Sequence, residues 1–162
     1  MNTAMGHTLK SALFALSLMG LSLHAQAQTQ VEDAWVRATV AGQPATGAFM
    51  HITSTTDSKL VGVSSPVAKM VQIHQSSMNN DVMSMRQVDS VELPAGKTVV
   101  FDANGYHVMF MGLAAQVKEG DKVPLTLTVQ DAKGVQESVE VLAPARALTT
   151  EDHGAHGAHS GH

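Results

Sequence analysis

Residues 104–111 read Asn-Gly-Tyr-His-Val-Met-Phe-Met, and they show the strand pattern of this chain most clearly. Asn104-Gly105 is a turn signal, and the residues that follow it alternate in character. Successive side chains of a strand point to opposite faces, so Val108 and Phe110 share one face while His107 and Met109 share the other. Because the apolar face must be the core, the stretch predicts a strand over 107–111 that turns its histidine and first methionine away from the core.

Short runs of the same kind fill the chain between residues 31 and 142. They are rich in β-branched residues, and turn signals separate them. The expected strands cover residues 31–38, 47–53, 60–64, 69–75, 82–88, 98–101, 107–111, 123–129 and 136–142. Many short strands at this spacing favour an all-β antiparallel sandwich or small barrel, and residues 28–148 have the ordinary length of one domain.

Soft metal donors occur at four positions on these expected strands: His74, Met85, His107 and Met109. The alternation that places Ile73 on the core face places His74 on the opposite face. Side chains at i and i+2 lie about 7 Å apart at the backbone, so an imidazole and a long Met can converge on one ion. Two imidazoles and two thioethers suit Cu(I), because thioether sulfur is soft and neutral and binds Zn²⁺, Mg²⁺ or Ca²⁺ poorly.

The residues alone leave a plainer interpretation open. Met is usually core filler, because it is flexible and fills gaps. Met111 shares the parity of Met109, and Met83 shares that of Met85; for Met111 and Met83 packing is the favoured interpretation. His51 is interpreted as structural, with no partner visible in the sequence.

The spacing His74-x10-Met85-x21-His107-x-Met109 resembles that of the PCu(A)C copper-chaperone family. The resemblance extends from about residue 31 to residue 142, and the segments that carry it are 33–37 (DAWVR), 93–96 (LPAG), 105–113 (GYHVMFMGL), 118–121 (KEGD) and 123–128 (VPLTLT). It implies a cupredoxin-like β-barrel that holds one Cu(I) at an exposed site, with the four motif residues as ligands.

The same resemblance implies a function, which is delivery of copper to the binuclear Cu(A) centre of cytochrome c oxidase subunit II. Thioredoxin-like Sco proteins are the implied collaborators. A periplasmic copper buffer without a dedicated oxidase acceptor is the alternative. A blue-copper electron carrier needs a Cys thiolate, and the chain contains no cysteine. Catalysis is not expected, because the sequence has no nucleophile elbow, HExxH or Gly-rich phosphate loop.

Residues 1–27 predict a signal peptide and therefore a periplasmic protein. Lys10 supplies the positive charge, residues 11–23 the apolar run, and Ala25-Gln26-Ala27 the cleavage site. The run is shorter than the about 20 residues of a membrane-spanning helix, and no cysteine follows it, so we expect no stable membrane insertion and no lipid anchor. The net charge of −4 and the absence of a basic patch argue against nucleic acid as a partner.

Residues 149–162 differ in composition from the domain. Histidines recur at every third position among Gly, Ala and Ser, as His153, His156, His159 and His162. Such a segment cannot bury a core, so we predict a disordered tail. Imidazole with backbone nitrogen suits Cu(II), and the tail is therefore a candidate for capturing that ion. A solvated tail without function is the alternative.

Overall fold

The computed structural model describes residues 28–147, and these residues form ten strands and no helix. The strands are β1 (Thr29–Arg37), β2 (Ala45–Ser54), β3 (Ser58–Ser64), β4 (Ala68–Asn79), β5 (Val82–Val88), β6 (Val91–Leu93), β7 (Thr98–Phe101), β8 (Tyr106–Leu113), β9 (Lys122–Asp131) and β10 (Gln136–Arg146). The all-β prediction is confirmed, and each of the nine expected strands overlaps one observed strand. The sequence missed β6, because three residues before a Pro-Ala-Gly turn are too few to show a period.

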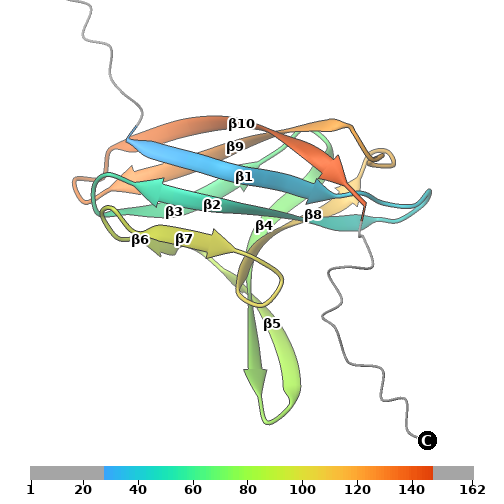
Figure 1. Cartoon of the computed structure of the whole chain (residues 1–162), viewed down its shortest axis with the longest axis horizontal. Helices are drawn as coiled ribbons and strands as arrows, with labels where there is room; N and C mark the ends of the chain where they lie inside the picture. The colour runs from blue at the N-terminus through green and yellow to red at the C-terminus, as the bar shows by residue number, and fades with distance from the viewer. Residues whose placement is uncertain (1–27, 148–162) are drawn as a thin grey trace, which may run out of the picture.

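The strands form one hydrogen-bonded sheet in the order β5-β4-β8-β7-β2-β1-β10-β9-β3-β6, and β2 also pairs with β8. Most pairs are antiparallel, as predicted, but β1 with β10 and β7 with β8 are parallel. The parallel contact between β1 and β10 joins two layers, in which β10-β9-β3-β6 lies against the remaining strands (Figure 1). The result is a sandwich from which one hairpin, β4–β5, projects (Figure 1).

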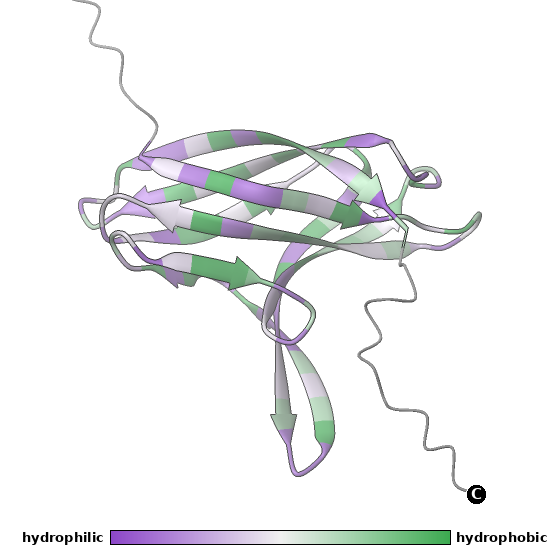
Figure 2. Cartoon of the chain, in the orientation of Figure 1, coloured by the Kyte–Doolittle hydropathy of each residue, from purple (hydrophilic) through white to green (hydrophobic). Residues whose placement is uncertain are grey.

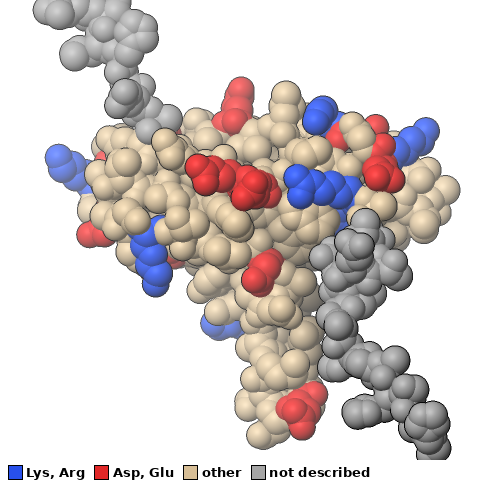
Figure 3. Space-filling view, viewed as in Figure 1, with Lys and Arg blue, Asp and Glu red and all other residues tan. Residues whose placement is uncertain are grey.

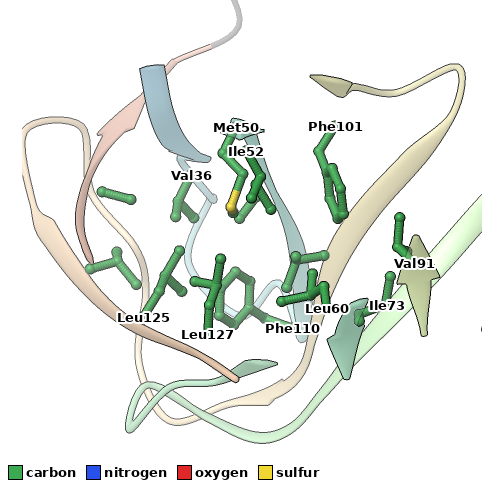
Figure 4. Packing of buried hydrophobic residues seen from close by; sticks show 14 of the residues in the cluster. Val36, Met50, Ile52, Leu60, Ile73, Val91, Phe101, Phe110, Leu125 and Leu127 are labelled. Carbon is green, nitrogen blue, oxygen red and sulfur yellow. The ribbon is translucent and has the colours of Figure 1, made fainter. Parts of the chain in front are cut away.

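The core lies between these two layers (Figure 4). Side chains from both layers fill it, among them Met50, Ile52, Leu60, Phe101, Phe110, Leu125 and Leu127. Val108 and Phe110 are fully buried, and Ile73 is almost so. Figure 2 shows the alternation of apolar and polar residues along the strands of the sandwich. The parity prediction for residues 107–111 is thus confirmed on its apolar face.

A tight turn closes the projecting hairpin. Asn79 pairs with Val82, which leaves Asn80 and Asp81 as a two-residue loop, and both loop residues have positive φ, at 50° and 62°. Positive φ at both positions is the mark of a type I′ turn, and Asn and Asp tolerate it better than most residues. Every β5 residue except Val88 is exposed. The outer part of the hairpin therefore presents both of its faces to solvent.

The surface carries interspersed charges. On the face shown in Figure 3, acidic and basic side chains alternate over the sandwich, and the projecting hairpin is mostly uncharged. Within residues 28–147, no helix is long and apolar enough to cross a membrane.

Candidate metal centre

The structure brings the two motif histidines together. His74 of β4 and His107 of β8 are directly opposed in the sheet, and their ring centroids lie 5.9 Å apart with the ring planes at 68°. A bond between an imidazole nitrogen and a first-row transition metal ion is about 2.0 Å long. The separation of the two rings therefore suits one ion that is bound by a nitrogen of each.

The two motif methionines lie on the same face as the histidines. Met109 is two residues along β8 from His107, and Met85 of β5 is opposite Ser76, two residues along β4 from His74. Met85, Met109 and His107 line one pocket of about 230 Å³. The other residues that line it are Arg37, Gln43, Ala45, Thr46, Gly47, Phe49 and Ala103. Three of the four predicted residues thus line one pocket, and the fourth, His74, lies beside it next to the His107 ring.

Exposure differs sharply across the set. His107 is only 3% exposed, whereas Met85 is 53% exposed. The expectation that these side chains reach an exposed site is therefore wrong for His107. Its side chain does point away from Val108, but residues of β2, such as Phe49, and the loop residue Ala103 line the pocket around it. The centre is closed at its histidine end and open on the side of Met85.

Hydrogen bonds leave one nitrogen of each imidazole free. His74 Nε2 lies 2.9 Å from Gln72 Oε1, and His107 Nδ1 lies 3.2 Å from the Gly105 carbonyl oxygen. Both oxygens only accept, so these nitrogens carry the protons, and the remaining nitrogen of each neutral ring has a lone pair. His74 Nδ1 is buried and has no partner among the described residues. A buried nitrogen lone pair without a partner is well suited to bind a metal ion.

The donor set also excludes a conventional nitrogen and oxygen site. Within residues 28–147, no three His, Cys, Asp or Glu side chains cluster so that they could hold a metal ion. A tetrahedral zinc site of the usual ligands is therefore not available in this part of the chain. The thioethers of Met85 and Met109 line the pocket together with His107, and thioether sulfur favours a soft ion.

Burial, reinforced by the nearby His107, lowers the pKa of His74 from its ordinary value. We expect the NMR titration of the copper-free protein to show His74 with an inflection below 6.5. The unfolded chain binds more protons than the folded one between the folded pKa and about 6.5, so stability falls as the pH drops through this window. An inflection at or above 6.5 would contradict the burial argument. His107→Asn serves as the control, since removing the neighbouring charge should let the pKa of His74 rise.

Sequence reasoning missed several residues around this centre. Gln72 could have been found, because it shares the strand parity of His74 and holds its Nε2 proton. Arg37 and Phe49 could not, because they are distant in sequence and meet only in the fold, where the Arg37 guanidinium lies 5.4 Å from the Phe49 ring centre. These two residues and Ala103 also line a larger pocket of about 560 Å³. The metal pocket therefore adjoins a broad depression.

The structure adds a partner for one histidine and corrects the interpretation of one methionine. His51 Nδ1 lies 3.4 Å from Asp33 Oδ2, in an exposed pair that the sequence does not reveal. Asp33 sits at a break in the β1–β2 register with a φ of 52°, which strand patterns do not reveal. Met83 is 54% exposed, so its interpretation as packing is wrong, whereas Met111 is half-buried. The signal segment 1–27 and the tail histidines His153, His156, His159 and His162 lie outside the described residues.

A family model described as "Putative lipoprotein LpqE-like" matches residues 29–141, most of the chain. The chain belongs to the LpqE-like family. A relative of this chain is "Putative lipoprotein Lxx21020" of Leifsonia xyli subsp. xyli (strain CTCB07). It is 32% identical in an alignment 141 residues long, which covers 80% of this chain and 85% of the relative.

Solved structures resemble this LpqE-like chain over most of its length. Apo-DR1885 from Deinococcus radiodurans is 28% identical, with a TM-score of 0.54 over 90% of this chain and 97% of that one. The CuI form of DR1885 is 27% identical, with a TM-score of 0.54 over 78% and 84%. The copper-bound PCuAC domain from PmoF2 is 21% identical, with a TM-score of 0.56 over 76% and 97%, and supports the fold alone. The predicted membership of the PCu(A)C family is confirmed.

Proposed function

We propose that this LpqE-like protein is an exported copper chaperone that binds one Cu(I) ion as its cargo. The ligands that we assign are two imidazoles and two thioethers, from His74, Met85, His107 and Met109. The observation that carries the proposal is the opposed pair of histidines, one of which, His107, lines a pocket together with both methionines. The CuI form of DR1885 supports the choice of metal.

The chemistry of the pocket fits a protein that holds Cu(I) and then releases it. All four ligands are neutral, so the bound site keeps the single charge of the ion, and soft sulfur selects Cu(I) over harder cations. The exposed Met85 lies on the side of the site that an acceptor can reach, and the buried His107 lies on the closed side. Thiolates of the acceptor bind Cu(I) more strongly than thioethers, which gives the transfer its direction.

We further propose that the acceptor is the Cu(A) centre of cytochrome c oxidase subunit II, with a Sco-like thioredoxin-fold protein as collaborator. The open side of the site and the depression beside it support a protein acceptor rather than closed storage. The alternative is a copper buffer, which would use the same ligands without a dedicated acceptor. The names of the lipoprotein relatives support export. A lipid anchor would need a cysteine, and this chain contains none. We therefore propose that residues 1–27 are a signal peptide that directs the protein to the periplasm and is cleaved near Ala27.

Direct transfer tests the proposal. When the Cu(I)-bound protein is mixed without oxygen with an isolated Cu(A) domain of subunit II, we expect copper to move to that domain. Separation of the two proteins followed by copper analysis measures the transfer. The control acceptor is the same domain with its cysteines replaced by serine, which should receive none. Retention of copper by the chaperone in both mixtures would reject delivery and favour the buffer.

The tail proposal has its own test. Deleting residues 151–162 should remove a Cu(II) site and leave Cu(I) binding intact, because the tail offers imidazole and backbone nitrogen but no sulfur. Titration of both proteins with each oxidation state measures the two capacities. Cu(II) capacity of the full chain should also fall below about pH 6.5, since imidazole must be neutral to bind a metal. Full Cu(II) capacity in the truncated protein would exclude the tail as the ligand.

A further inference from the structure

The face that carries the metal pocket continues to the tip of the projecting hairpin. Beyond the rung of Met85 and Ser76, the next rung on this face pairs Met78 with Met83. Met78 is 65% exposed and Met83 54% exposed, so neither side chain belongs to the core. One face of the hairpin thus presents three exposed thioethers, from Met78, Met83 and Met85.

The geometry of the turn brings the outer pair close together. In a hairpin with a two-residue loop, the pair next to the loop is hydrogen-bonded, and the following pair is not. Met78 and Met83 form this second pair, in which side chains come closest, with Cβ atoms about 4.5–5.5 Å apart. Two flexible thioethers at this separation can bind one ion, and Met85 lies one rung, or about 7 Å, further along β5.

The opposite face of the same hairpin has a different character. Ser77 and Ser84 are hydrogen-bonded through their hydroxyls at 2.9 Å, and Arg86 donates to Gln75 Oε1 at 2.9 Å. The hairpin is therefore held together and solvated on its polar face. On the thioether face both side chains at the tip are more than half exposed, so their sulfur atoms belong to a surface and not to the core.

We propose that Met78, Met83 and Met85 form a second, weaker Cu(I) site at the hairpin tip, through which the ion enters and leaves the histidine centre. The proposal rests on the proposed function, since Met85 is shared by both sites. In the transfer, Met85 stays bound while Met78 and Met83 replace the two imidazoles and Met109. The ion remains Cu(I) throughout, and only metal–ligand bonds form and break. Three neutral thioethers suit this soft ion.

Methionine methyl NMR of the full chain, titrated with Cu(I) without oxygen, tests the site directly. The first equivalent should shift the methyl signals of Met85 and Met109, and further equivalents those of Met78 and Met83. Met70 is the matched control, because it is 52% exposed on the same sheet face while its sulfur accepts from the Gln72 amide at 3.2 Å. Shifts of Met78 and Met83 no larger than that of Met70 would overturn the tip site. Absent shifts of Met85 and Met109 in the first equivalent would overturn the proposed function instead.

Kinetics test the role of the tip in transfer. The double variant Met78→Leu/Met83→Leu keeps apolar volume but lacks both sulfurs, and Met70→Leu is its control. We expect the double variant to pass Cu(I) to a chelator severalfold more slowly, with unchanged affinity for the first equivalent. Surface substitutions of this kind change stability little, so the fold is retained. An unchanged transfer rate in the double variant would overturn the path through the tip.

Discussion

Replacing either motif histidine by alanine is expected to remove most Cu(I) affinity, and His107→Ala should destabilise the fold more than His74→Ala. Loss of a direct ligand should exceed the about 10–100-fold that loss of an outer-shell partner costs. His107 is 3% exposed and bonded to the Gly105 carbonyl, so its removal leaves a cavity and loses a hydrogen bond worth about 0.5–1.5 kcal/mol. His74→Ala loses a part-buried hydrogen bond to Gln72 but also removes a buried nitrogen that has no partner in the described structure, so it should cost less than His107→Ala.

Competition with a chromophoric Cu(I) chelator measures the affinities, and urea unfolding of the copper-free proteins measures the stabilities. Met111→Leu is the matched control for binding, because it alters a thioether of the same strand and parity that we do not assign to the metal. Wild-type Cu(I) affinity in either histidine variant would remove that histidine from the ligand set. Equal losses of stability in the two variants would contradict the difference in burial.

Phe110→Ala is expected to cause the largest loss of stability, about 3–5 kcal/mol. The ring is fully buried between the two layers, so its removal leaves a cavity. Such a loss is a large part of the about 5–15 kcal/mol by which domains are stable. Met111→Ala, on the half-buried opposite face, should cost clearly less. Chemical denaturation of the copper-free proteins at constant pH gives both values.

The Phe110 prediction also separates stability from binding. Cu(I) binds the folded state, so an excess of the ion should stabilise Phe110→Ala and wild type by similar amounts. If Phe110→Ala and Met111→Ala lose the same stability, strand parity does not decide burial in β8.

The sequence predicts this fold well where one strand shows a clear alternation. Val108 and Phe110 were assigned to the core from parity alone, and the structure buries both. The alternation along a strand predicts the face on which a side chain lies, but it does not predict which residue of the neighbouring strand lies opposite. That His74 lies directly opposite His107 follows from the register of β4 and β8, which no local pattern specifies.

For a related reason, the sequence does not predict the burial of His107. Arg37 and Phe49 line its pocket, and they come from β1 and β2, which reach β8 only through the folded sheet. The sequence favours packing for Met83, because Met usually fills cores. Only the projection of the hairpin from the sandwich reveals that its tip has no core to fill (Figure 1).

β5 lies at one edge of the sheet, and this position bears on how an acceptor could detect whether copper is bound. Within the described residues, β5 pairs with β4 alone, so its outer amides lack a neighbouring strand. Edge strands of this kind open locally at a small fraction of the global unfolding free energy, and their amide hydrogens exchange quickly. An ion that joins Met85 to His107 would tie this edge to a buried strand. Slow hydrogen exchange in β5 would then report a filled site, and an acceptor could distinguish full from empty protein by the order of one strand.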